Sequence, residues 1–170
     1  AQLLSVLRPE LNRASDKESL TRAREALKLT SELKLPQASK AINEALQIDP
    51  RNSYLHFFNG LIYHLQARQG DTDKTNLAIE GYQQAVRFDP NNWIAHEFLG
   101  LAYVEMRQYA RAQASFAEVL LSKAEDQDTI QRLMVASYLS GDAATSCNMA
   151  DRAASQTRRP EQRFLRASIL

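Results

Sequence analysis

The stretches "AINEALQIDPRN" (41–52) and "GYQQAVRFDPNN" (81–92) decide the fold, because they are two versions of one pattern. Each closes an amphipathic helix and runs into an Asp-Pro pair. Proline has no amide hydrogen and disfavours helix in the residue before it, so Pro50 and Pro90 each end one helix and prepare the next. A less perfect copy, "SFAEVLLSKAED" (115–126), lacks the proline. The sequence therefore predicts a helical repeat.

Counting from the two prolines gives the length of the repeat. Units that start three residues after each proline begin at Ser53 and Trp93. Steps of 34 residues then lead forward to Gln127 and back to Ser19. The second unit is longer, and its extra residues fall in "ARQGDTDKT" (67–75), which predicts a loop in which Gly70 ends one helix and Asp73 caps the next. The predicted units are 19–52, 53–92, 93–126 and 127–160.

These units resemble the tetratricopeptide repeat. The third unit matches the pattern of that family best, with Leu99, Gly100, Tyr103, Ala112 and Phe116 at places 7, 8, 11, 20 and 24. The fourth is the most degenerate, with Met134, Ser146 and Ala150 at places 8, 20 and 24, although Gly141 remains at its inter-helix turn. The resemblance covers residues 19–160. It implies an all-α fold, a right-handed superhelical solenoid of antiparallel helix pairs with about four repeats and a truncated fifth.

The two ends of the chain lie outside the four units. Residues 1–18 do not fit the register, and we expect an N-terminal cap or a degenerate helix there. Residues 161–170, "EQRFLRASIL", fit the first ten places of another unit and predict the first helix of a truncated repeat. Their side chains Phe164, Leu165, Ile169 and Leu170 are apolar, which predicts self-association through this edge and a parent protein that continues beyond it.

Charge and composition exclude several classes of partner. The chain has 21 Lys and Arg residues against 20 Asp and Glu residues, so no basic face for nucleic acid is expected. No stretch approaches the roughly 20 apolar residues that span a bilayer, so direct membrane insertion is not expected. A single cysteine, Cys147, excludes an internal disulfide framework. This cysteine content suits the cytoplasm and the bacterial periplasm equally, and localisation stays open.

Catalytic and metal-binding signatures are weak. "HEFLG" (96–100) begins like a zinc-protease motif but has Gly100 in place of the second histidine. His56 and His96 share place 4 of adjacent units, where the family has a bulky packing residue, so a structural role is favoured. The segment 71–82 lacks the glycine and glutamate of a calcium loop. Cys147 lies in a second helix and is interpreted as a packing residue. The sequence thus predicts no enzyme, no metal and no cofactor.

Recognition is expected on the first helix of each unit, which lines the inner surface in the resembling family. Its inner places are apolar or aromatic in much of this chain and include no basic residue, so the carboxylate clamp of the chaperone-binding members is not expected. The alternative is that part of this stripe packs against neighbouring helices. The predicted peptide-binding groove consists of Tyr54, Phe57, Leu61, His64, Ile94, Leu101, Val104, Val135 and Tyr138.

Two functions remain open from the sequence. The first is a non-enzymatic scaffold for protein–protein interaction that binds an apolar peptide or helical segment in its groove, as one part of a larger bacterial protein. The second is a structural spacer or self-associating repeat region of a secretion, pilus-assembly or exopolysaccharide-export machine. A groove filled by the parent's own helices would favour the second.

Overall fold

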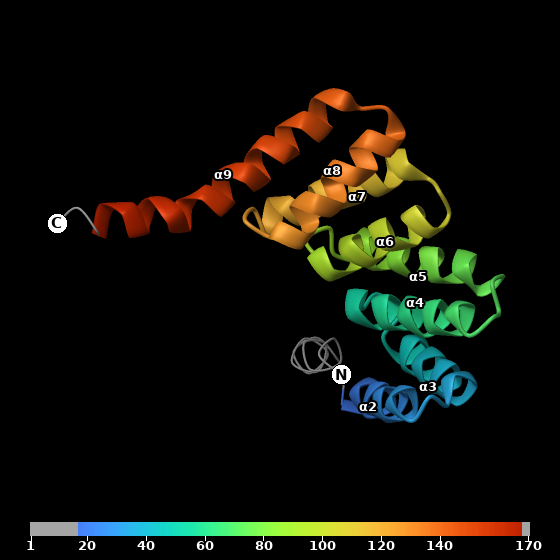
Figure 1. Cartoon of the computed structure of the whole chain (residues 1–170). Helices are drawn as coiled ribbons and strands as arrows, with labels where there is room; N and C mark the ends of the chain where they lie inside the picture. Colours follow the sequence, from blue (N-terminus) through green and yellow to red (C-terminus); the bar gives the residue numbers. More distant parts are fainter. Residues whose placement is uncertain (1–16, 168–170) are drawn as a thin grey trace. The chain divides into compact units, whose positions relative to one another are not determined.

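A computed structural model of the chain describes the backbone of residues 17–167 and the side chains of residues 17–155. All regular structure in this range is α-helix, and consecutive helices such as α2 and α3, α4 and α5, and α8 and α9 pack as antiparallel neighbours (Figure 1). The prediction of an all-α fold of helix pairs is confirmed. The helices are α2 (Lys17–Ser31), α3 (Leu35–Ile48), α4 (Ser53–Arg68), α5 (Lys74–Phe88), α6 (Trp93–Glu105), α7 (Tyr109–Ser122), α8 (Gln127–Ser140) and α9 (Ala143–Ala167).

The chain divides into two compact units. The first ends at Ala102 and the second begins at Tyr103, within α6. In the first unit α2 packs on α3, α3 on α4, and α4 on α5, while in the second α7 packs on α8 and α8 on α9. We propose that the four helix pairs correspond to the four repeats predicted from the sequence.

The Asp-Pro pairs of the first unit end helices as predicted. α3 and α5 stop directly before Asp49 and Asp89, and the residue three places after each proline starts the next helix. The side-chain oxygen of Asn52 accepts hydrogen bonds from the backbone amides of Tyr54 and Leu55. Asn92 does the same for Ala95, at 3.0 Å. These caps satisfy amides that have no partner inside the helix.

A buried chain of hydrogen bonds joins two neighbouring repeats of the first unit. The side-chain amide of Asn92 donates to the hydroxyl of Ser53 at 2.9 Å, and that hydroxyl donates to the carbonyl oxygen of Ala85 at 2.7 Å. The side chains of Asn92 and Ser53 are both buried. The bonds therefore align the start of α6 with the start of α4 and the end of α5.

The predicted loop at residues 67–75 is shorter in the structure. α4 continues to Arg68 and α5 begins at Lys74, so residues 69–73 form the turn. Gly70 has a φ of 118° and follows the end of α4, which confirms its predicted role. The predicted cap by Asp73 is wrong, because its side chain accepts no capping hydrogen bond. Asp73 has helical φ and ψ angles, −64° and −22°, rather than the extended conformation of a capping residue.

Two glycines allow the helices of the second pair to touch. A Cβ atom on Gly81 of α5 would lie 2.7 Å from the Cα and backbone nitrogen atoms of Gly60 of α4. A Cβ atom on Gly60 would lie 2.8 Å from the carbonyl oxygen of Ala78. The two backbones therefore pack directly against each other.

In the second unit, aspartates cap α8 and α9. Asp126 caps α8 through the backbone amide of Thr129, at 2.9 Å, and Asp142 accepts from the amide of Thr145 at the start of α9, at 3.0 Å. Gly141 lies between α8 and α9 with a φ of 88°, which confirms the turn predicted there. Arg152 of α9 donates a hydrogen bond to the carbonyl oxygen of Ala124 before α8.

The predicted helix boundary between residues 160 and 161 is wrong. α9 runs from Ala143 to Ala167 without a break, so residues 161–167 continue this helix, while residues 168–170 lie outside the described residues. Proline costs a helix one backbone hydrogen bond but does not by itself start a new helix. Asn52 and Asn92 follow Pro50 and Pro90, whereas residues 161–165, "EQRFL", include no residue of the capping type. The predicted cap at residues 1–18 falls on residues 1–16, outside the described range, and on the first two residues of α2.

Candidate functional site

The predicted groove residues separate into two groups by their exposure. Phe57, Leu61, His64 and Ile94 are buried, with at most 5% of each side chain exposed. The prediction that these four line an open surface is wrong for the folded chain. Tyr54 and Leu101 are half-buried. Val104, Val135 and Tyr138 are exposed, by 36%, 50% and 73%.

An aromatic cluster explains the burial in the first unit. The ring of Phe57 lies 5.5 Å from that of Tyr82 in α5 and 5.3 Å from that of Phe98 in α6, measured between ring centroids. Phe98 and Tyr82 are 5.9 Å apart. A side chain from the next repeat thus covers the inner face of α4, and tilted and edge-to-face ring contacts of this kind favour packing. The alternative of packing against neighbours, which the sequence left open, applies to this helix.

His64 belongs to the same core. Its Nδ1 atom lies 3.1 Å from the hydroxyl oxygen of Tyr82, and both side chains are buried. Each polar atom of this pair thereby gains a partner inside the core, as buried polar groups require. His64 is therefore a core residue and not a surface contact.

The other two histidines have the structural role predicted for them. The Nε2 atom of His56 donates to the carbonyl oxygen of Pro50 at 2.8 Å, and that of His96 donates to Pro90 at 3.0 Å. The same bond therefore recurs at place 4 of two consecutive repeats. The prediction of a packed Cys147 is wrong, because this side chain is exposed on α9.

One face of α8 carries exposed apolar side chains in the second unit. Val135, Tyr138 and Leu139 are exposed by 50%, 73% and 47%. Their spacing of three and four residues places them on the same side of the helix. We call these three residues the α8 face. Leu139 also occupies an inner place of the fourth unit by its spacing, although it is not among the nine residues of the predicted groove.

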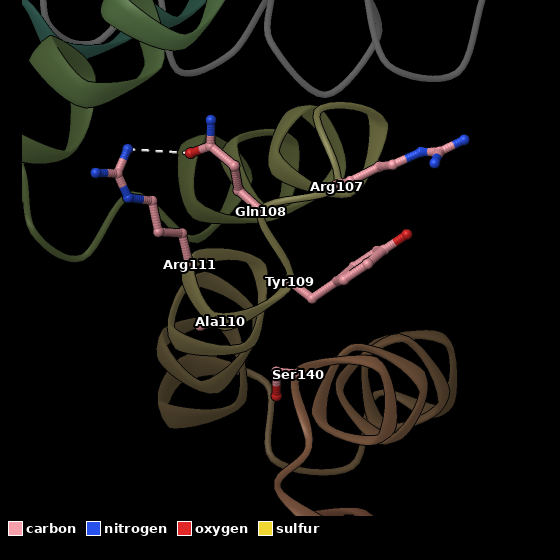
Figure 2. A pocket seen from close by; sticks show the side chains of 6 residues that line it. All are labelled: Arg107, Gln108, Tyr109, Ala110, Arg111 and Ser140. Atoms are coloured by element: carbon pink, nitrogen blue, oxygen red, sulfur yellow. Dashed lines mark hydrogen bonds between the residues drawn. The ribbon is translucent and has the colours of Figure 1, made fainter.

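A shallow pocket of about 550 Å³ lies elsewhere in the second unit, at the turn between α6 and α7. Arg107, Gln108, Tyr109, Ala110, Arg111 and Ser140 line it (Figure 2). Figure 2 shows that Arg107 and Arg111 point to opposite sides, and Arg111 donates a hydrogen bond to Gln108 at 3.0 Å. The guanidinium group of Arg111 also lies 5.7 Å from the centroid of the Tyr103 ring. The two cations therefore do not converge on one ligand.

Ionisable groups with a shifted pKa in the second unit are helix caps. The hydroxyl of Thr129 donates to Asp126 and lowers the pKa of that carboxyl below its usual 3.8. Thr145 and Gln113 donate to Asp142 and lower its pKa in the same way. A hydrogen bond to the charged form favours ionisation. Among residues 17–167, no three His, Cys, Asp or Glu side chains gather as metal ligands would, and every helix is too short or too polar to cross a bilayer.

Comparisons with known proteins give structural neighbours only. No family model and no curated protein matches the chain. A crystal structure of MamA is similar with a TM-score of 0.72 at 14% identity, over 94% of this chain and 89% of that chain. The Sgt2 TPR domain from Aspergillus fumigatus is similar with a TM-score of 0.64 at 20% identity, over 77% of this chain and 84% of that chain.

A third neighbour is a complex. The first TPR of Spaghetti (RPAP3), bound to the HSP90 peptide SRMEEVD, has a TM-score of 0.64 at 17% identity, over 74% of this chain and 95% of that chain. Together with the helix pairs and the repeated caps, these neighbours identify the fold.

Proposed function

From the tetratricopeptide-repeat fold of this chain, we propose that it is a non-enzymatic interaction module that binds an apolar segment of another protein. The observation that carries this proposal is the α8 face, where three large apolar side chains are exposed on one side of one helix. Contiguous apolar surface of this kind marks interaction sites more often than isolated exposed residues do.

Energetics favour Tyr138 as the anchor of this contact. Burial of apolar surface contributes about 25 cal/mol per Å². Tyr138 is 73% exposed, so a partner can bury much of its ring. Tyrosine is also among the residues most often found as binding hot spots. Leu61 and His64 occupy the same repeat places as Val135 and Tyr138, but they are buried and offer no such surface.

The proposed ligand differs from the acidic peptide in the RPAP3 complex. No residue of the α8 face is basic, so this face offers nothing to pair with the three carboxylate side chains and the chain end of SRMEEVD. We expect that peptide to bind far more weakly than an apolar one. The wider setting, in a larger bacterial protein or in a secretion or assembly machine, remains a prediction of the sequence alone.

Selection from a displayed library of linear peptides tests the proposal. We expect wild-type chain to enrich apolar sequences, and Tyr138→Ala to weaken their binding by about 2 kcal/mol or more if Tyr138 is a hot spot. Calorimetry measures the affinity, and thermal unfolding of the same variant should be nearly unchanged because the side chain is exposed.

A matched control is Leu121→Ala. Leu121 is a large apolar residue of α7 with 80% of its side chain exposed, so its removal tests whether any exposed apolar residue would matter. Peptides that bind Tyr138→Ala as tightly as wild type, or a selection that enriches nothing, would contradict the proposal.

A further inference from the structure

One side of α7 is apolar and exposed along most of its length. It consists of Ala110, Ala114, Ala117 and Leu121, which we call the α7 face. All four side chains are exposed, and Leu121 has the largest exposed fraction, 80%, of the large apolar residues in the described part of the chain. Steps of four, three and four residues place them on the same side of the helix. Contiguous apolar surface of this kind indicates a contact.

The repeat register shows that the α7 face is unusual in this chain. Its four residues occupy places 18, 22, 25 and 29 of the third repeat. The same places of the other second helices are also exposed, but they are mostly polar. They hold Pro36, Lys40, Asn43 and Gln47 in α3, Asn76, Glu80, Gln83 and Arg87 in α5, and Ala144, Asn148, Asp151 and Ser155 in α9.

The stacking of repeats leaves these places exposed. α3 packs on both α2 and α4, and α7 packs on α8, yet the four places remain exposed in α3 and in α7. Adjacent helices therefore pack beside this side of a second helix and not over it. The apolar residues of the α7 face are accordingly available to an occupant outside the stack of repeats.

The α7 face is complementary to an antiparallel copy of itself. Steps of four and three residues are those of the a and d positions of a coiled coil. In a pair of α7 helices related by a two-fold axis between Ala114 and Ala117, Leu121 of each copy lies opposite Ala110 of the other. Each large side chain thus meets a small one, and the alanines at the centre let the two helices approach closely.

Two opposite charges flank the α7 face where such a pair would use them. Arg111 and Glu118 are both exposed and lie seven residues apart, so they share one flank of α7. The two-fold axis brings this flank of both copies together and separates Arg111 from Glu118 of the other copy by about 3 Å along the helix axis. Arg111 donates to the neutral side chain of Gln108 in the single chain, and it would exchange this bond for a carboxylate. The pair therefore gains two equivalent ion pairs on the same side.

We propose that the α7 face binds the α7 face of a second copy of this chain, as an antiparallel helix pair. A second copy is the occupant because the order of small, large and charged residues along α7 is complementary to itself under a two-fold axis. The contact goes beyond the proposed function, since it lies on another helix than the α8 face, and it does not involve residues 161–170. One helix pair buries less surface than the roughly 1,200–2,000 Å² of stable complexes, so the dimer is weak.

Sedimentation equilibrium of the full chain tests the inference, with circular dichroism to verify that each variant is folded. We expect a wild-type dimer with a dissociation constant between about 10 μM and about 1 mM. Leu121→Glu should weaken it at least about tenfold, because a charge then faces an alanine of the other copy. Gln47→Glu is the matched control, since Gln47 is exposed at the same place of α3 and receives the same charge.

A charge exchange tests the antiparallel arrangement. Arg111→Glu and Glu118→Arg should each weaken the dimer about fivefold at low salt, because like charges then meet across the axis. The variant that carries both changes should regain the wild-type affinity. Such a recovery is not expected from a merely structural effect on α7, where the two residues are two turns apart.

Several outcomes would overturn the inference. A chain that stays monomeric up to about 1 mM has no such contact. A dimer that Leu121→Glu leaves unchanged uses another surface, for example residues 161–170. If the double charge exchange does not restore the dimer, the two α7 helices do not meet in this way. Tyr138→Ala should dimerise like wild type, so these results are independent of peptide binding at the α8 face.

Discussion

Ser137 differs from the residue found at the same place of the preceding repeats, and this difference lowers the stability of the chain. It occupies place 11, where the two preceding repeats have Tyr63 and Tyr103, and its side chain is fully buried in α8. Its hydroxyl oxygen has no hydrogen-bond partner among the described residues. A buried polar group without a partner loses its hydration and gains nothing in exchange.

We therefore expect Ser137→Ala to stabilise the chain. Removing the hydroxyl should raise the free energy of unfolding by about 1 kcal/mol, as measured by urea denaturation. Ser122→Ala, at an exposed position of α7, is the control and should change stability little. A loss of stability in Ser137→Ala would show that the hydroxyl has a partner.

Phe57 and Tyr138 show what a sequence can and cannot predict about a site. Helical spacing identified both as residues of the inner face, and that is correct for their position on the helix. Spacing does not tell whether a neighbouring helix covers that face. Phe98 covers Phe57, whereas Tyr138 is 73% exposed among the residues that the structure describes, so the difference comes from tertiary packing. Only the register of whole repeats, compared in the structure, separates the two.

Among the elements, the crossing of α4 and α5 tolerates least change. We expect Gly81→Ala to lower the free energy of unfolding by about 2 kcal/mol, although alanine is the better helix former, because its Cβ would meet the backbone of Gly60. Thermal or urea unfolding checks this. Glu80→Ala, one residue earlier and exposed, should be close to neutral. A stabilised Gly81→Ala would mean that the helices separate at little cost.

The turn between the two helices of each pair contains one residue whose backbone has the left-handed conformation, with a positive φ angle. Gly70 and Gly141 supply it in two pairs, whereas Leu33 and Arg107 adopt φ angles of 58° and 57° in the others. A side chain makes this conformation cost roughly 1 kcal/mol or more. We expect Leu33→Gly and Arg107→Gly each to stabilise the chain by several tenths of a kcal/mol, after the greater flexibility of unfolded glycine is subtracted. Gly70→Ala should do the reverse, and urea denaturation compares all three variants.

Element boundaries were predictable where two signals coincide. Asp49-Pro50 and Asp89-Pro90 are each followed by an asparagine that caps the next helix, and both boundaries were predicted correctly. At Pro160 only the repeat count suggested a boundary, and α9 continues. At Asp73 a capping residue is present, but its backbone is already helical. A boundary between two helices is predictable where a residue that ends one helix is followed by a residue that caps the next. The repeat length alone does not identify such a pair of residues.

At the scale of the whole molecule, the two units differ in how their helices are capped. Asn52 and Asn92 cap α4 and α6 with amides that do not titrate, whereas Asp126 and Asp142 cap α8 and α9 with carboxylates. The pKa of both aspartates is lowered in the folded chain by hydrogen bonds from Thr129 and Thr145. Their stabilisation is therefore complete above the usual pKa of 3.8 and is lost as the pH falls through the lowered folded value.

Acid should accordingly weaken residues 127–155 before residues 53–102. We expect amide-exchange protection factors of residues 127–155 to fall more than those of residues 53–102 as the pH drops from about 5 to about 2.5. The variant carrying Asp126→Asn and Asp142→Asn should lose this difference, since its caps no longer titrate. An equal response of both segments in wild type would contradict the assignment.

A natural fluorescent probe lies next to the hydrogen-bonded junction of Asn92, Ser53 and Ala85. Trp93, the single tryptophan, is half-buried and follows Asn92 directly at the start of α6. Its fluorescence therefore reports on that one junction, whereas far-ultraviolet circular dichroism averages over all the helices. If the denaturant-unfolding curves measured by fluorescence and by circular dichroism do not coincide, the chain has intermediates in which one unit is folded. This measurement needs no dye or added reporter.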